Sequence, residues 1–124
     1  MLPVKGRPWR DIVEHFRLLV NGNKGGYVFL PMLQFVEQIA TAEFTDRIHA
    51  ITSMHDVIVS DLPEFDLDRD VLKIEFDPKA GMVRFEYWET RSPLYKRWKK
   101  TCPPEHAFSS FVRFLKLKQW LPRQ

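Results

Sequence analysis

The chain contains one cysteine, Cys102, and its neighbours in the sequence are those of a reactive thiol. Lys99 and Lys100 precede it, and His106 follows four residues later. A helix N-terminus and nearby cations favour the nucleophilic thiolate form of a cysteine. A nucleophile also requires a base, an orienting group and an oxyanion hole, and no local motif supplies them. A thiol-dependent enzyme at Cys102 is therefore our second alternative for the function.

An acidic stretch begins like a calcium-binding loop but does not continue as one. Asp66, Asp68 and Asp70 occupy the first three ligand positions of such a loop. The position that requires a sharply turning glycine is Val71, and the twelfth position, Asp77, belongs to a predicted hairpin. We therefore interpret this stretch as a solvated acidic loop, and we expect neither a metal nor a cofactor.

A third group consists of a serine, a histidine and an aspartate, the residue types that form a catalytic triad. Ser53, His55 and Asp56 are too close together to converge if this segment is extended, because neighbouring side chains point to opposite faces. His49 and His55 are metal-ligand types, but two histidines with this spacing form no metal motif. We interpret the segment as the start of a strand, where Ser53 or Asp56 bonds to local backbone, and we expect no catalytic residue.

The charge of the chain is unevenly distributed, although its net value is only +3 and its isoelectric point about 9.1. The run Asp61–Asp70 holds five acids and one base, whereas Arg91–Lys100 holds five bases and no acid. Basic residues interleaved with aromatic residues can contact phosphates and stack on bases, so nucleic-acid binding is our first alternative. Its candidate contacts are Arg91, Tyr95, Lys96, Arg97, Trp98, Lys99 and Lys100.

Between these two runs, alternating side chains predict a central β-hairpin over residues 71–88, with strands Val71–Phe76 and Met82–Trp88 and the turn Pro78–Gly81. One register makes one face wholly apolar and opposes unlike charges on the other. Its pairs are Leu72–Tyr87, Ile74–Phe85 and Phe76–Val83, with Lys73–Glu86 and Glu75–Arg84 on the charged face. Because that face is internally paired, we expect the hairpin to be a scaffold, and we expect function to lie on the flanking segments.

Apolar residues at helical spacing predict helices over Pro8–Val20 and from Pro31 to about Ala42. A final amphipathic helix follows Thr101 or Cys102, one of which we expect to be its cap.

The segment 54–60 is a predicted strand, the segment 89–101 a predicted basic connection, and residues 44–52 fit a helical turn or a strand equally well. The whole pattern predicts an α+β fold, in which a small antiparallel sheet packs against about three helices.

The length of 124 residues indicates a single domain, 1–124. One cysteine cannot form an internal disulfide, which is typical of a reducing compartment. The first ten residues lack the apolar run of a signal peptide, and we find no stretch long enough to span a membrane. We therefore expect a cytoplasmic protein without membrane contact.

Two stretches carry a resemblance to a known kind of protein. One is Ser53–Ser60 (SMHDVIVS), and the other is Phe85–Trp88 (FEYW) followed by Trp98, Cys102 and a final helix that ends near Trp120. This pattern resembles small single-domain immunity proteins of bacterial toxin systems. The resemblance implies a non-enzymatic protein that neutralises one cognate toxin by tight binding, and it implies no particular contact residue.

We therefore expect a protein-binding module, and the acidic loop is the first candidate for its contact surface. A dense charged face speeds and directs association, and a basic toxin that degrades nucleic acid fits an acidic surface. Phe65 lies among the acids and is a candidate apolar anchor. The complete set of candidate contacts is Asp61, Glu64, Phe65, Asp66, Asp68 and Asp70.

Overall fold

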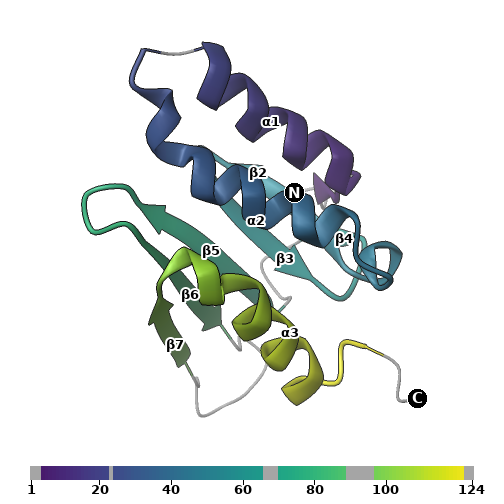
Figure 1. Ribbon diagram of the computed structural model, residues 1–124. Coiled ribbons are helices and arrows are strands. Elements are labelled where there is room, and N and C mark those ends of the chain that lie inside the picture. The colour runs from purple at the N-terminus through teal and green to yellow at the C-terminus, as the bar shows by residue number, and fades with distance from the viewer. Residues whose placement is uncertain (1–3, 23, 66–69, 89–96, 122–124) are drawn as a thin grey trace.

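The computed structural model describes residues 4–22, 24–65, 70–88 and 97–121. Figure 1 shows the helices α1, α2 and α3 packed together on one face of an antiparallel sheet with the strand order β2-β3-β5-β6-β7. The helices are α1 (Trp9–Gly22), α2 (Leu30–Ala40) and α3 (Ala107–Leu117). The strands of this sheet are β2 (His49–Ser53), β3 (Asp56–Ser60), β5 (Val71–Asp77), β6 (Met82–Trp88) and β7 (Arg97–Cys102). The predicted α+β fold is confirmed.

Short elements connect and extend this frame. Single 3₁₀ turns lie at Gly26–Phe29, Thr45–Arg47 and Pro104–His106. The strands β1 (Val4–Lys5) and β4 (Glu64–Phe65) pair with each other to form a separate two-stranded sheet.

The predicted hairpin has the predicted register. β5 and β6 pair residue for residue, with Leu72 opposite Tyr87 and Phe76 opposite Val83. Gly81 has a φ of 66° and donates its N–H to the carbonyl of Asp77 at 2.7 Å, which closes the turn. Alternation of apolar and charged side chains, together with a glycine at the left-handed position, is therefore sufficient to specify this hairpin.

Two strands of the five-stranded sheet were not predicted, and neither were the short strands β1 and β4. The segment 44–52, left open by the sequence, forms a 3₁₀ turn and then β2. The predicted connection 89–101 is wrong in its second half, because residues from Arg97 onward form β7 and pair with β6. A strand at the edge of a sheet tolerates charged side chains on both faces, so its alternation is hidden in the sequence.

The final helix begins later than expected. Thr101 and Cys102 do not cap it, because both belong to β7, and His106 precedes the first residue of α3. A residue that precedes a proline is driven away from helical angles. Cys102 precedes Pro103, and Pro103 itself precedes Pro104 and is extended, with φ −64° and ψ 155°. The two prolines therefore prolong the strand and delay the helix.

One hydrophobic core fills the space between the helices and the sheet. Phe35 on α2 lies at its centre, with ring centroids 6.1 Å from Phe85 on β6 and 5.9 Å from Phe111 on α3. Trp120 folds back after α3, and its ring centroid lies 5.3 Å from that of Phe114. The apolar face of the hairpin is thus covered, and its other face points away from the helices.

Candidate functional site

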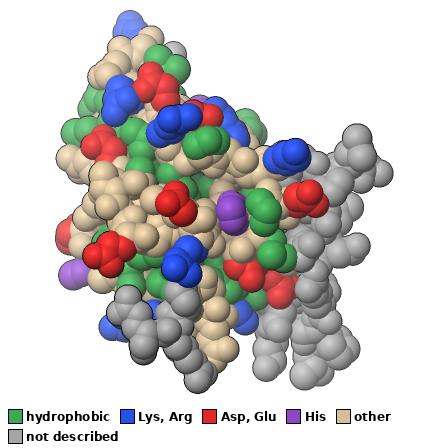
Figure 2. Space-filling view, turned by 90° about the vertical axis from the view of Figure 1, so that its right-hand side faces the viewer, with side chains coloured by type: hydrophobic (Ala, Val, Ile, Leu, Met, Phe, Trp, Pro, Cys, Tyr) green, Lys and Arg blue, Asp and Glu red, His purple; other side chains and the backbone are tan. Residues whose placement is uncertain are grey.

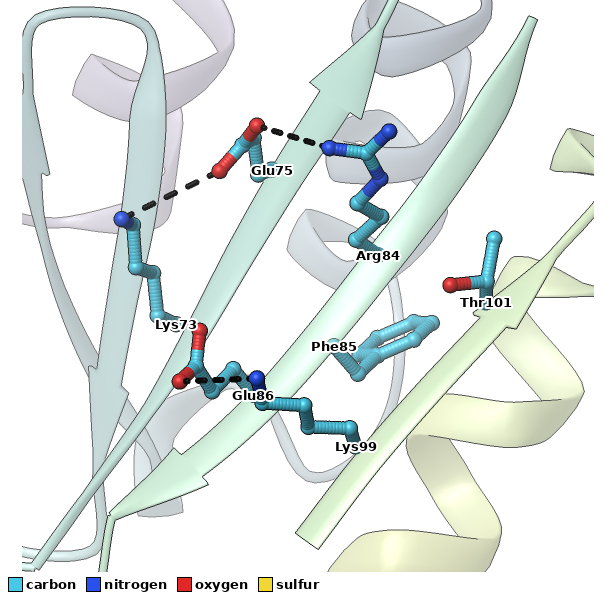
Figure 3. Close-up of a pocket in the computed structure, with 7 residues that line it drawn as sticks. All are labelled: Lys73, Glu75, Arg84, Phe85, Glu86, Lys99 and Thr101. Atoms are coloured by element: carbon cyan, nitrogen blue, oxygen red, sulfur yellow. Dashed lines mark ion pairs between the residues drawn. The ribbon is translucent and has the colours of Figure 1, made fainter. Parts of the chain in front are cut away.

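The outward face of the sheet carries rows of ionisable side chains. Residues directly opposite each other share a face, so the register places Lys73, Glu86 and Lys99 in one row and Glu75, Arg84 and Thr101 in the next. Figure 3 shows these side chains in front of the strands, with the helices behind. We call the following set the charged sheet face: Asp56, Lys73, Glu75, Asp77, Arg84, Glu86, Lys99 and Thr101.

One ion pair of the charged sheet face is as short as a hydrogen bond. Arg84 contacts Asp77 at 2.6 Å, whereas its distance to Glu75 is 3.6 Å. The ammonium of Lys73 lies 3.5 Å from Asp56 and 3.8 Å from Glu75, and Lys99 lies 3.9 Å from Glu86. Partly exposed pairs at such distances contribute little to stability. The expected internal pairing is present, although Lys73 pairs with Asp56 and Glu75 and not with Glu86. Because most of these pairs are longer than a hydrogen bond, the groups keep the capacity to bond to another molecule.

The Asp77 carboxylate is held ionised by the turn that follows it. Its Oδ1 accepts the backbone N–H groups of Lys79 at 3.0 Å and Ala80 at 3.2 Å. The bond from Ala80 is the main reason that the pKa of Asp77 lies below its ordinary value; the Lys79 N–H and the Arg84 guanidinium add to this lowering, and burial opposes it. Arg84 is thus fixed in place by a carboxylate that stays charged.

A shallow hollow of about 200 Å³ lies within the charged sheet face. It is lined by Lys73, Glu75, Arg84, Phe85, Glu86, Lys99 and Thr101. Both signs of charge meet in it, and Figure 2 shows acidic and basic side chains interspersed on an adjoining side of the molecule. A phosphate backbone selects a surface of positive charge, whereas protein surfaces present both signs. The hollow is therefore suited to charged side chains of a protein.

The predicted acidic contacts are only partly brought together. Asp61 and Glu64 are exposed, Asp70 is half-buried just before β5, and Asp66 and Asp68 lie outside the described residues. The expected exposure of Phe65 is wrong, because its side chain is only 6% exposed.

Pairing between β4 and β1 explains the burial of Phe65. It brings Phe65 against Gly6, where an added Cβ would lie 3.3 Å from the Phe65 ring and 3.0 Å from the Cβ of His49. Burial lowers the pKa of His49, and the Asp61 carboxylate opposes this shift. Asp61 lies near the start of β2, because it follows Ser60, which pairs with His49.

The predicted nucleic-acid contacts are divided between the two faces of the sheet. Trp98 and Lys100 lie on the helix-covered face, and the Trp98 ring centroid is 5.2 Å from that of Phe114. Lys99 lies on the outward face and is 65% exposed. Arg97 begins β7, and Arg91, Tyr95 and Lys96 lie outside the described residues. Packing of Trp98 against the helix removes it as a stacking surface for bases.

Cys102 is not placed as a reactive thiol requires. It ends β7 opposite Val83, it is 5% exposed, and it belongs to the hydrophobic core. A buried thiol away from a helix N-terminus is typical of an unreactive cysteine. We expect iodoacetamide at pH 7.5 to alkylate Cys102 slowly in the native protein and rapidly in denaturant. An equal rate under both conditions, measured by intact mass, would contradict this burial.

The three triad types do not converge, although Ser53 and Asp56 lie directly opposite each other at the ends of β2 and β3. The side chain of Asp56 points to Lys73 on the charged sheet face, whereas His55 lies in the turn between β2 and β3 and contacts α1. His49 is at the other end of β2.

A histidine pair, unforeseen in the sequence, joins this turn to α1. Nδ1 of His55 lies 3.5 Å from Nε2 of His15, and the ring of Phe29 packs on His55 with centroids 5.3 Å apart. One proton is shared between the two facing nitrogens, so the bond requires at least one neutral imidazole. No sequence signal pointed to this pair, because its members are 40 residues apart.

The pair predicts a loss of stability in mild acid. Burial lowers the pKa of His15, and His55 and Arg7 lower it further, while a bond to the Met54 backbone raises it. A histidine with a lowered pKa stabilises the fold fully above its ordinary value of about 6.5, and this contribution falls as the pH drops towards the lowered value. We expect proton NMR to show His15 titrating below the ordinary value, and closer to it in His55→Ala. An unchanged His15 titration in that variant would contradict the contact.

No family model matches the chain, and no curated protein or solved structure matches it either. In the described ranges, no three His, Cys, Asp or Glu side chains gather to hold a metal ion. Among the same residues, no helix combines the length and apolar character needed to cross a membrane. The fold defines an α+β protein with helices on one side of an antiparallel sheet, and the charged sheet face is its best-developed candidate site.

Proposed function

We propose that this protein acts by binding a protein partner rather than by catalysis, and that the charged sheet face is its contact surface. The proposal rests on the arrangement of the charged side chains of this face in rows across the strands. Basic and acidic side chains alternate across β5, β6 and β7, and most of their mutual distances are longer than a hydrogen bond. A partner with complementary charges can bond to these groups and fix its own orientation.

Apolar side chains lie next to the charged sheet face. Ile51 and Ile58 continue the row of Lys73 on the outward face and are half-buried. Protein interfaces combine apolar contact area with a polar, hydrogen-bonding rim. Exposed Asp61 follows Ser60, the last residue of β3, and adds an acidic group at one end of the same sheet. Neutralisation of a cognate toxin, which the resemblance to bacterial immunity proteins implies, is the more specific form of this proposal.

The proposal is tested by using the purified chain as bait in an extract of its source. A retained protein is identified, purified alone, and titrated against the chain at several salt concentrations. We expect a 1:1 complex whose affinity falls as salt rises, because exposed charges are screened. Mixed RNA and DNA are applied to the same bait at low salt. Retention of nucleic acid without a protein that rebinds after purification would contradict the proposal and support nucleic-acid binding.

A further inference from the structure

The tip of the β2–β3 hairpin has an unusual residue at its tightest position. Ser53 and Asp56 are the last paired residues, so Met54 and His55 form a two-residue loop. Met54 has a φ of 57°, and among the described residues Gln119 is the other non-glycine residue with positive φ. Positive φ at the first loop position alone is the pattern of a type II′ turn, where glycine is preferred. Met54 therefore occupies a strained backbone position.

Met54 is also the most exposed large hydrophobic side chain of the described residues, at 87%. The fold gains almost nothing from burying it, so packing does not explain why a large apolar side chain stands where glycine fits better. Strained backbone of this kind clusters at functional sites and ligand contacts. Methionine is flexible and polarisable, and it is common at binding surfaces because it adapts to irregular pockets.

The tip is held in place on two sides. The His15–His55 contact joins it to α1, and the ring of Phe29 packs on His55 with centroids 5.3 Å apart. On the sheet side, Asp56 follows the loop and contacts Lys73 at 3.5 Å, which makes the tip continuous with the charged sheet face. A side chain presented on a fixed loop loses less conformational freedom on binding.

We propose that Met54 is an anchor residue that inserts into an apolar pocket of the protein partner, beside the contact made by the charged sheet face. This inference rests on the proposed function and adds the chemistry of the partner's surface: a pocket of aliphatic or aromatic side chains next to charged groups. Burial of one methionine side chain is sufficient to change affinity about tenfold to hundredfold.

Substitutions of Met54 distinguish an effect on partner binding from an effect on the stability of the fold. We expect Met54→Gly to keep or raise the Tm, because glycine relieves the strain of the turn, and to weaken the purified partner's binding about tenfold to hundredfold. Met54→Leu retains an apolar side chain and is expected to bind within a few-fold of the wild type. Leu117→Asn is the matched control, because Leu117 is 68% exposed on α3, and it is expected to leave binding unchanged.

Oxidation gives a second measurement. Hydrogen peroxide converts an exposed methionine to its sulfoxide, and Met54 is expected to react faster than Met32, which is fully buried. We expect the partner to protect Met54, as measured by peptide mass spectrometry. Binding of Met54→Gly within twofold of the wild type, or undiminished oxidation of Met54 in the complex, would overturn the anchor. If charge reversal on the sheet face still weakens binding in that case, the proposed function stands without the anchor.

Discussion

Phe35→Ala is expected to lower the free energy of unfolding by about 3–5 kcal/mol, the usual cost of removing a buried phenylalanine ring. Phe35 is 1% exposed, and its ring meets Phe85 of the sheet and Phe111 of α3 edge-on. One side chain thus connects α2 both to the sheet and to α3. Because small domains have a total stability of about 5–15 kcal/mol, this variant loses a large share of it.

Urea denaturation followed by circular dichroism measures this effect, with a lower midpoint and an unchanged slope. Leu117→Ala is the control, because it removes an exposed side chain and is expected to stay within about 0.5 kcal/mol of the wild type. A loss below about 1 kcal/mol for Phe35→Ala would show that this ring does not join the layers as described.

The double variant Lys73→Glu with Lys99→Glu is expected to weaken binding of the purified partner at least about a hundredfold at low salt, since like charges across an interface cost several kcal/mol. Both lysines flank Glu86 in one row of the charged sheet face. Their ion pairs are partly exposed and long, so the fold itself is expected to lose only about 1 kcal/mol per pair or less. Calorimetric titration measures the affinity, and the Tm verifies the fold.

A matched control distinguishes the loss of local contacts at the charged sheet face from the effect of the changed net charge on partner binding. Arg17→Glu with Lys116→Glu reverses two exposed cations on α1 and α3, so the change in net charge is the same. We expect this control to bind within a few-fold of the wild type. An equal loss in both double variants would assign the effect to long-range attraction and would contradict a contact at the charged sheet face.

The hairpin was predictable to its exact register because its information is local. Apolar and charged side chains alternate with period two over β5 and β6, and Gly81 marks the turn. α1 and α2 were likewise predicted to within two residues of their ends, because their apolar side chains recur at helical spacing. Such patterns depend on neighbours along the chain and need no knowledge of the tertiary structure.

The remaining features depend on contacts between distant segments. Phe65 is buried by β1, which lies some sixty residues earlier in the chain, so its acidic neighbours gave a misleading picture of its exposure. The lysines of β7 concealed a strand at the sheet edge, and that strand turns Trp98 towards α3. The row that joins Lys73, Glu86 and Lys99 exists only once β7 is placed beside β6.

NMR mapping of the partner onto the chain tests directly whether the charged sheet face is the contact surface. Amide chemical shifts of the ¹⁵N-labelled protein are followed while the unlabelled, purified partner is added. We expect the largest changes on outward residues of β5, β6 and β7, led by Lys73, Arg84 and Glu86. Changes confined to the outer surfaces of α1, α2 and α3, with the sheet unaffected, would contradict a contact at this face.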